Sequence, residues 1–199
     1  MSQPYVLKLF TEVAAILDGH FLLSSGLHSE KYLQCARVLQ YPGPAERLCA
    51  DLAERFRQDG LVPDVILAPA LGGILVAYAV ASAMVRMGPY GHLRNLFAER
   101  EGGVLGLRRG FEIFPGERVI VVEDVITTGG STRETITLAR AHGGQVIAVG
   151  ALVDRGACAA FDVPTHSLLR LDFRNFKPEE CPQCRARNPL VKPGSRTPA

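Results

Sequence analysis

The fold is decided by residues 119–132, which read Val119-Ile-Val-Val-Glu-Asp-Val-Ile-Thr-Thr-Gly-Gly-Ser-Thr132. The first four residues are an unbroken β-branched run, which predicts a fully buried strand. The last six form a polar Thr/Gly/Ser loop that we expect to open a helix. Its amides and hydroxyls would then converge on an anion at the positive end of the helix dipole. The stretch predicts a strand, a loop and a helix built around an anionic ligand.

Two adjacent carboxylates, Glu123 and Asp124, stand between this strand and this loop. Acids beside an anion site are electrostatically unfavourable unless they accept hydrogen bonds. Vicinal sugar hydroxyls can donate such bonds, and the same acids would stabilise a metal or an oxocarbenium-like transition state. Gly129 and Gly130 would let the backbone approach a monophosphate closely. The pattern favours a ribose-phosphate site over a surface turn with incidental acids, and the chain lacks the glycine motifs of dinucleotide and nucleotide-triphosphate loops.

Strands and helices alternate along the rest of the chain, which predicts right-handed crossovers and a parallel sheet. Ligands bind beyond the carboxyl ends of the strands in such sheets, and both the 123–132 loop and an earlier glycine loop at 69–73 lie there. We expect helices over residues 4–18, 44–59, 74–87 and 131–142. Two hairpins are expected, an N-terminal one of 19–23 with 31–35 and a second of 103–108 with 111–114. Single strands are expected at 65–68, 95–98, 119–122 and 146–153.

Bulk composition narrows the class of protein. The chain has 199 residues, of which 47% are hydrophobic and 21% charged, so we expect one globular domain spanning 1–199. Its net charge of +2 is dispersed, which argues against a nucleic-acid partner. The N-terminus has no secretory pattern, and the apolar stretch 73–85 is too short to span a bilayer. Five cysteines, an odd number, indicate reduced thiols, so a cytoplasmic protein without membrane contact is expected.

Residues 121–131 resemble the phosphoribosyl-diphosphate signature of type I phosphoribosyltransferases. The resemblance extends to the orotate-using branch of that family up to about Leu190. Residues 19–29 are similar to its hood over the pyrimidine, residues 68–74 to its pyrophosphate loop, and residues 153–156 to the segment with an arginine against the orotate carboxylate. The resemblance implies an α/β fold with a central parallel sheet flanked by helices.

The resemblance also implies a small hood formed mainly by residues 19–40 and a loose tail from about residue 189. The implied reaction joins orotate to phosphoribosyl diphosphate, giving orotidine 5'-monophosphate and pyrophosphate in pyrimidine synthesis. Magnesium would be held mainly by substrate oxygens, without dedicated protein ligands. A homodimer is implied as well. A phosphoribosyltransferase for a purine base and a non-catalytic regulator of the same fold remain alternatives.

The family assigns roles to matching positions of this chain. Glu123 and Asp124 would bind the ribose hydroxyls and act in catalysis, and Arg100 would neutralise the departing pyrophosphate. Orotate would contact Arg155 and Thr127. Phosphoribosyl diphosphate would further contact Val125, Ile126, Thr127, Thr128, Gly129, Gly130, Ser131 and Thr132, together with Ala70, Leu71, Gly72 and Gly73.

The chain departs from the family pattern at three places. Many relatives carry a long, cation-rich loop where this chain has only residues 98–103, in which Arg100 is the one cation. Leu71-Gly72 stands where many relatives have an aromatic residue and a lysine, and Ser24 stands where a lysine is common. These departures indicate a subgroup with a short catalytic loop.

Cys181-Pro-Gln-Cys184 has the spacing of half a zinc site or of a redox pair. A closed zinc site needs four ligands, and the chain has no second pair of this spacing, so a structural turn is the favoured interpretation. The hood histidines, His20 and His28, are candidates for packing as much as for substrate contact.

Overall fold

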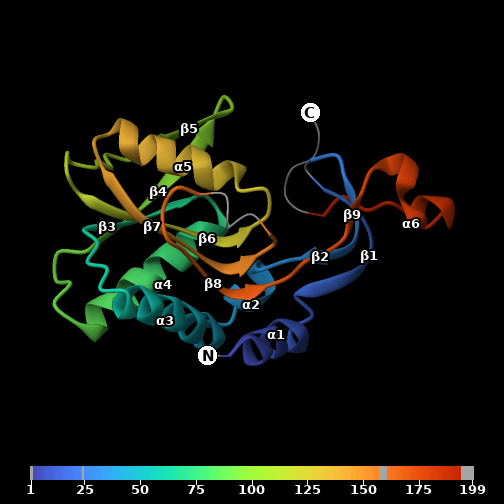
Figure 1. The fold of residues 1–199 in the computed structure, drawn as a ribbon, viewed down its shortest axis with the longest axis horizontal. Coiled ribbons are helices and arrows are strands. Elements are labelled where there is room, and N and C mark those ends of the chain that lie inside the picture. Colours follow the sequence, from blue (N-terminus) through green and yellow to red (C-terminus); the bar gives the residue numbers. More distant parts are fainter. Residues whose placement is uncertain (1, 24, 157–160, 194–199) are drawn as a thin grey trace.

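A computed structural model describes residues 2–23, 25–156 and 161–193. Its centre is a six-stranded sheet (Figure 1) in which neighbouring strands run parallel, except for the antiparallel pair at one edge. This arrangement confirms the α/β class and the predominantly parallel sheet. The strands lie in the order β5 (Val104–Leu107), β4 (Arg94–Glu101), β3 (Val65–Pro69), β6 (Arg118–Ile126), β7 (Gln145–Asp154) and β8 (Thr165–Arg170).

Helices cover both faces of this sheet, and the alternation along β6 explains why. Ile120 and Val122 pack into one apolar core with α3 (Pro42–Gln58) and α4 (Gly72–Met87). Val119 and Val121 point to the opposite face and pack into a second core with α5 (Gly130–Ala141). A strand that is buried on both sides needs the unbroken apolar run seen in the sequence. The N-terminal helices α1 (Gln3–Glu12) and α2 (Ala36–Leu39) join the first core.

A second, three-stranded sheet projects from this body (Figure 1); it contains the hairpin of the predicted hood and is called the hood below. The predicted hairpin is present as β1 (Ile16–Leu22) and β2 (His28–Leu33). The third strand, β9 (Asn175–Phe176), comes from the far end of the chain and was not predicted. Beyond β9 lie a 3-10 turn, η2 (Pro178–Glu180), and the short helix α6 (Pro182–Arg185).

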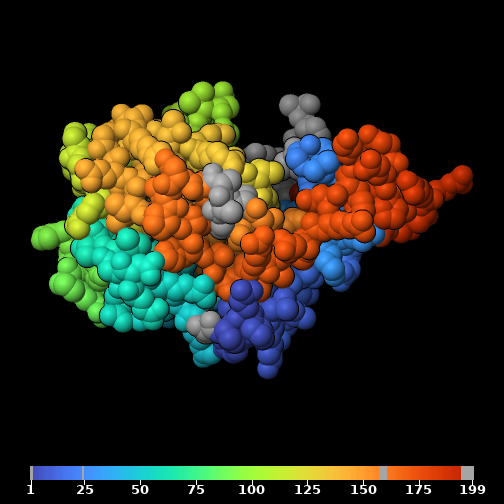
Figure 2. Space-filling model, in the orientation of Figure 1, coloured from blue at the N-terminus to red at the C-terminus, as the bar shows by residue number. Residues whose placement is uncertain are grey.

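The prediction of a loose tail from about residue 189 is wrong for Val191. Val191 donates its N–H to the His20 carbonyl at 2.8 Å and accepts from the Leu22 N–H at 2.9 Å, so it lies along β1. Figure 2 shows the α6 lobe packed beside the hood. The hood is therefore built from both ends of the chain; residues 194–199 of the tail lie outside the described part.

Two predicted elements differ from those observed. The helix expected over residues 4–18 ends at Glu12, because Ile16 and Leu17 are extended and pair with Leu33 and Tyr32. The hairpin expected from residues 103–108 and 111–114 is instead formed by β4 and β5, and 111–114 is not a strand. Glu101 pairs with Val104 across Gly102-Gly103, both with positive φ, as a two-residue hairpin turn requires. Strand β8 was missed.

Burial tests several further predictions. Cys35, Cys49 and Cys158 stand in apolar-patterned segments, which predicts core positions for them. Cys35 and Cys49 are buried, as predicted, whereas Cys158 lies outside the described residues. The apolar pattern of residues 74–87 predicts Tyr78, Met84 and Met87 as helix core. Met84 is buried, but the exposed fractions of Tyr78 and Met87 are 64% and 38%. Among the described helices, none is both long and apolar enough to cross a membrane.

Candidate active site

The two predicted ligand loops meet at one edge of the sheet. β3 and β6 are parallel neighbours, with Val65 beside Val119, so their carboxyl ends lie together. The contact is close: a β-carbon on Gly72 would stand 2.7 Å from Asp124 Cγ and closer still to its Oδ2. Only glycine fits there without displacing the carboxylate. The sequence placed both loops correctly, and the Gly72–Asp124 contact shows how tightly they fit.

The acidic pair lies within β6 rather than after it, because the ladder with β7 continues from Glu123–Ala151 to Ile126–Asp154. Consecutive residues of a strand point to opposite faces. Glu123 points toward α5 and accepts a hydrogen bond from Ser131 Oγ at 2.6 Å. Asp124 points toward Gly72 on the other face, and its Oδ1 accepts the Val125 N–H at 2.9 Å. The two carboxylates therefore flank the strand end.

Burial makes both acids hard to ionise. It raises the pKa of Glu123 to about 8, with a further contribution from the charge of Asp124, while the Ser131 hydrogen bond opposes the rise. Burial also raises the pKa of Asp124, against hydrogen bonds from the backbone. A ligand that donates hydroxyl hydrogen bonds or brings positive charge would favour the ionised forms. The pair is suited to a sugar with vicinal hydroxyls.

Glu123→Gln should stabilise the ligand-free protein at high pH. The pKa of this acid is about 8 in the folded state against an ordinary 4.5, so the folded state retains a proton that the unfolded chain loses. Wild-type stability should therefore fall as the pH rises from about 4.5 to about 8. The glutamine amide cannot ionise, which should give the variant an advantage on the order of 4 kcal/mol at about pH 8.5 that disappears near pH 4.

Urea unfolding across this pH range measures the effect. Glu54→Gln is the matched control, because Glu54 is a half-exposed surface acid whose pKa is lowered by its hydrogen bond to Arg57. It should gain nothing at high pH. Equal stability of wild type and Glu123→Gln at the alkaline end of the range would contradict a raised pKa at position 123.

The predicted phosphate cradle, residues 127–132, turns at Gly129, whose φ of 74° only glycine adopts easily. A β-carbon there would also lie 2.9 Å from the Phe161 ring. Thr127, Thr128 and Gly130 are exposed at the start of α5, where an anion would meet free amides. Thr132 differs, since its side chain is 1% exposed.

Arg133 was missed by the sequence analysis. Its Nη1 donates to the Thr128 carbonyl at 2.8 Å, and its guanidinium lies 5.5 Å from the centroid of the Phe161 ring. The arginine thus fixes the conformation of the cradle and adds positive charge beside it. Its position four residues after Gly129, one helical turn away, was the available signal.

Arg155 follows β7 and lies between the body and the hood. Its backbone N–H donates to the Ile126 carbonyl at 2.8 Å, which fixes it beside the end of β6. Its guanidinium lies 4.5 Å from the Phe173 ring centroid, and Nη2 donates to Asn175 Oδ1 at 3.3 Å. Arg155 Nε is buried and has no hydrogen-bond partner among the described residues. The side chain is therefore held in place while its Nε–H remains available to donate a hydrogen bond to a ligand.

Tyr32 of the hood is another residue that sequence reasoning did not assign. Burial raises the pKa of its phenol, the charge of Asp124 raises it further, and Arg155 lowers it. These interactions place Tyr32 within electrostatic range of both Asp124 and Arg155. Burial lowers the pKa of Arg155 in turn, partly offset by Tyr32. A hood aromatic, an acid and an arginine therefore gather at one site.

Arg100 lies on β4, and its guanidinium forms an ion pair with Glu134 of α5. The other cations of this hairpin are also paired, Arg108 with Glu101 and Arg109 with Glu99. The short catalytic loop expected over 98–103 is thus mostly strand, with a turn of two glycines. In this conformation Arg100 is paired within its own chain.

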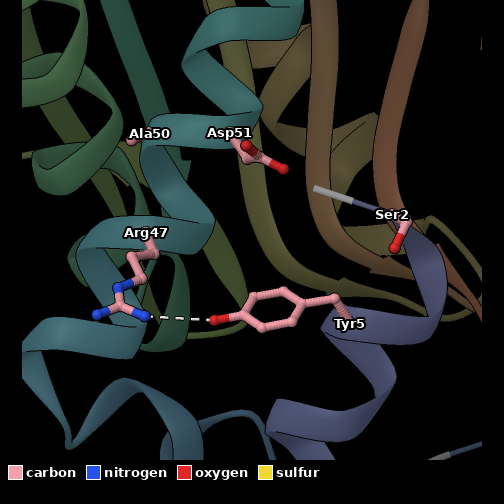
Figure 3. A pocket seen from close by; sticks show the side chains of 5 residues that line it. All are labelled: Ser2, Tyr5, Arg47, Ala50 and Asp51. Atoms are coloured by element: carbon pink, nitrogen blue, oxygen red, sulfur yellow. Dashed lines mark hydrogen bonds between the residues drawn. The ribbon is translucent and has the colours of Figure 1, made fainter.

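The pocket in Figure 3 lies elsewhere, between α1 and α3. Its wall includes Tyr5 and Arg47, whose Nη1 donates to the tyrosine hydroxyl at 3.3 Å. None of its lining residues belongs to the loops described above, so it plays no part in the site.

Comparison with known proteins agrees with this geometry. A family model described as "Phosphoribosyl transferase domain" matches residues 42–172. An orotate phosphoribosyltransferase of Caldanaerobacter subterraneus subsp. tengcongensis is 51% identical over 197 residues, which are 98% of this chain and 99% of the relative. That of Heliobacterium modesticaldum is 50% identical over 198 residues, 99% of this chain and 100% of the relative.

Among solved structures, the orotate phosphoribosyltransferase of Aeropyrum pernix matches with a TM-score of 0.66 and 27% identity, covering 83% of this chain and 93% of that one. The chain therefore belongs to the phosphoribosyltransferase family. Within that family it groups with the orotate phosphoribosyltransferases, as its relatives at about half identity show.

Proposed function

We propose that the protein transfers the phosphoribosyl group from phosphoribosyl diphosphate to orotate, giving orotidine 5'-monophosphate and pyrophosphate in pyrimidine synthesis. The observation that carries the proposal is the convergence of the acidic pair, the Gly72 loop and Arg155 at one edge of the sheet. The family supplies the reaction type, and a positioned arginine with spare donors suits the orotate carboxylate.

Catalysis in this proposal is positioning and electrostatics, without a covalent nucleophile. The cradle at 127–132 holds the 5-phosphate, and residues 70–73 hold the pyrophosphate. Glu123 and Asp124 accept hydrogen bonds from the ribose hydroxyls, and their charge stabilises the cationic sugar as the bond to pyrophosphate breaks. Arg155 and Thr127 orient orotate, which attacks as an anion. Arg100 would have to exchange its Glu134 partner to meet pyrophosphate.

Magnesium is the expected cofactor. Of the described residues, the one group of three or more histidine, cysteine or acidic side chains that could hold an ion includes neither Glu123 nor Asp124. In this proposal the ion is carried mainly by the oxygens of the diphosphate, with the site acids nearby. When bound, magnesium neutralises charge on the leaving group.

A homodimer is also proposed. Leu71, Leu75, Tyr78 and Val85 have exposed fractions of 75, 55, 64 and 45%. Their spacing puts them on one side of α4, forming an apolar stripe of the kind that a second copy would cover. We further propose a single domain over 1–199 acting in the cytoplasm, where its cysteines would stay reduced.

Loss of orotate absorbance in the presence of phosphoribosyl diphosphate and magnesium tests the reaction. We expect orotate to be consumed at least about 100-fold faster than hypoxanthine, adenine or uracil, because only orotate carries a carboxylate for Arg155. Faster use of a purine would favour the purine enzyme. Binding of phosphoribosyl diphosphate by folded protein without turnover of any base would favour the regulator.

A further inference from the structure

Four potential metal ligands meet in the hood, away from the residues assigned to the reaction. His20 and His28 come from the hairpin, and Cys181 and Cys184 from the segment around α6. Their ligand atoms all lie within 4.8 Å of one another. His20, His28 and Cys181 are buried, with exposed fractions of 4, 5 and 0%, and Cys184 is the more exposed member.

The separations match a tetrahedral ion. Ligands at the usual zinc distances stand about 3.3 Å apart for two nitrogens and about 3.6 Å for a nitrogen and a sulfur. His20 Nε2 lies 3.0 Å from His28 Nδ1. Cys181 Sγ and Cys184 Sγ lie 3.4 and 3.6 Å from His20 Nε2, and Cys184 Sγ lies 3.3 Å from His28 Nδ1. These four separations are close to those of ligands around one tetrahedral ion, and the remaining two are within 4.8 Å.

The surroundings of His20 also favour the neutral tautomer whose Nε2 can bind a metal. Its Nδ1 lies 2.9 Å from the Asn188 carbonyl, which can only accept a hydrogen bond. The proton is therefore held on Nδ1, and the Nε2 lone pair faces the two sulfurs. A backbone carbonyl in this role is a common outer partner of metal-bound histidines.

We propose that His20, His28, Cys181 and Cys184 bind one structural Zn²⁺ ion. Two thiolates and two imidazoles in a closed tetrahedron are a typical structural zinc set, with no position open for substrate. The ion would fasten the α6 segment to the hairpin. The chain just before this segment forms β9, whose Asn175 accepts the hydrogen bond from Arg155, so the ion would also steady the orotate side of the site. The proposal does not depend on the reaction assigned above.

Metal analysis of the full-length protein, purified with reduced thiols and dialysed without chelator, tests the proposal. We expect about one zinc ion per chain in the wild type and less than a tenth of that in Cys184→Ser and His28→Gln. Replacement of zinc by cobalt should give the visible bands of a tetrahedral ion and a thiolate-to-cobalt band, both absent from the two variants. Removing zinc with a chelator should lower the Tm by about 5 °C or more.

Cys49→Ala and His142→Gln are matched controls, since Cys49 is buried in α3 and His142 lies at the end of α5. Both should keep full zinc. Cys184→Ser changes the most exposed of the four ligands, so its fold should survive, which circular dichroism would check. Wild-type protein that takes up no zinc or cobalt, a Cys181–Cys184 disulfide in its place, or unchanged zinc in both folded variants would overturn the proposal.

Discussion

Asp124→Asn should lower the rate of orotate consumption by about 1000-fold while the protein stays folded. The substitution keeps the shape of the side chain against Gly72 and can retain the hydrogen bond from the Val125 N–H. It removes the negative charge that would face the sugar cation. The loss of a preorganised charge at a developing ion costs about 3–4 kcal/mol, which corresponds to about two to three orders of magnitude in rate.

Single-turnover kinetics with saturating substrates measures this effect on the chemical step. Asp162→Asn is the matched control, because Asp162 is a carboxylate in an exposed ion pair with Arg140, and we expect less than a twofold change there. Affinity for phosphoribosyl diphosphate should fall much less than the rate in Asp124→Asn. A normal rate in this variant would remove the carboxylate from the mechanism.

The core of the site could be predicted because its determinants are local. An apolar run with β-branched residues predicts β6, and glycines next to hydroxyl residues predict the cradle. The parallel arrangement then brings the 69–73 loop to the same edge. The sequence could not show two close contacts between these parts. Gly72 lies directly against the Asp124 carboxylate, and Arg133 donates a hydrogen bond to the Thr128 carbonyl.

The hood could be predicted only in part, because its second half comes from the far end of the chain. β9 pairs with β2 across more than a hundred residues, and Val191 pairs beside His20. No local pattern encodes such contacts. For the same reason the sequence showed only Cys181 and Cys184, which have the spacing of half a zinc site. The fold brings the two hood histidines to them.

Other wrong predictions arose where the spacing of apolar residues is compatible with more than one structure. Val6, Leu9, Val13 and Ile16 share helical spacing, yet the helix ends at Glu12 and Ile16 belongs to a strand. Pairing with β2 outweighs the local helical pattern there. Tyr78 illustrates a second limit, since an apolar residue on a helix can face a core or a second subunit, and spacing alone does not distinguish them.

Arg155→Ala should raise the KM for orotate by about 100- to 1000-fold and change the KM for phosphoribosyl diphosphate less than threefold. The arginine rests on Phe173 and bonds Asn175, and its buried Nε has no partner among the described residues. A carboxylate would supply the missing acceptor. Losing a charge-assisted pair in a half-buried site costs about 3–4 kcal/mol, which sets the expected range.

Steady-state kinetics with each substrate varied in turn measures the change. Arg170→Ala is a matched control, since Arg170 is an exposed arginine paired with Asp172, and its orotate KM should stay within twofold of wild type. Arg155→Lys separates charge from geometry: lysine keeps the charge but loses the forked donor pair, so it should recover only part of the affinity. Uracil lacks the carboxylate, so its weak use should be nearly unaffected by Arg155→Ala. Equal losses for orotate and phosphoribosyl diphosphate would instead mean that Arg155 holds the hood to the body and does not recognise the base.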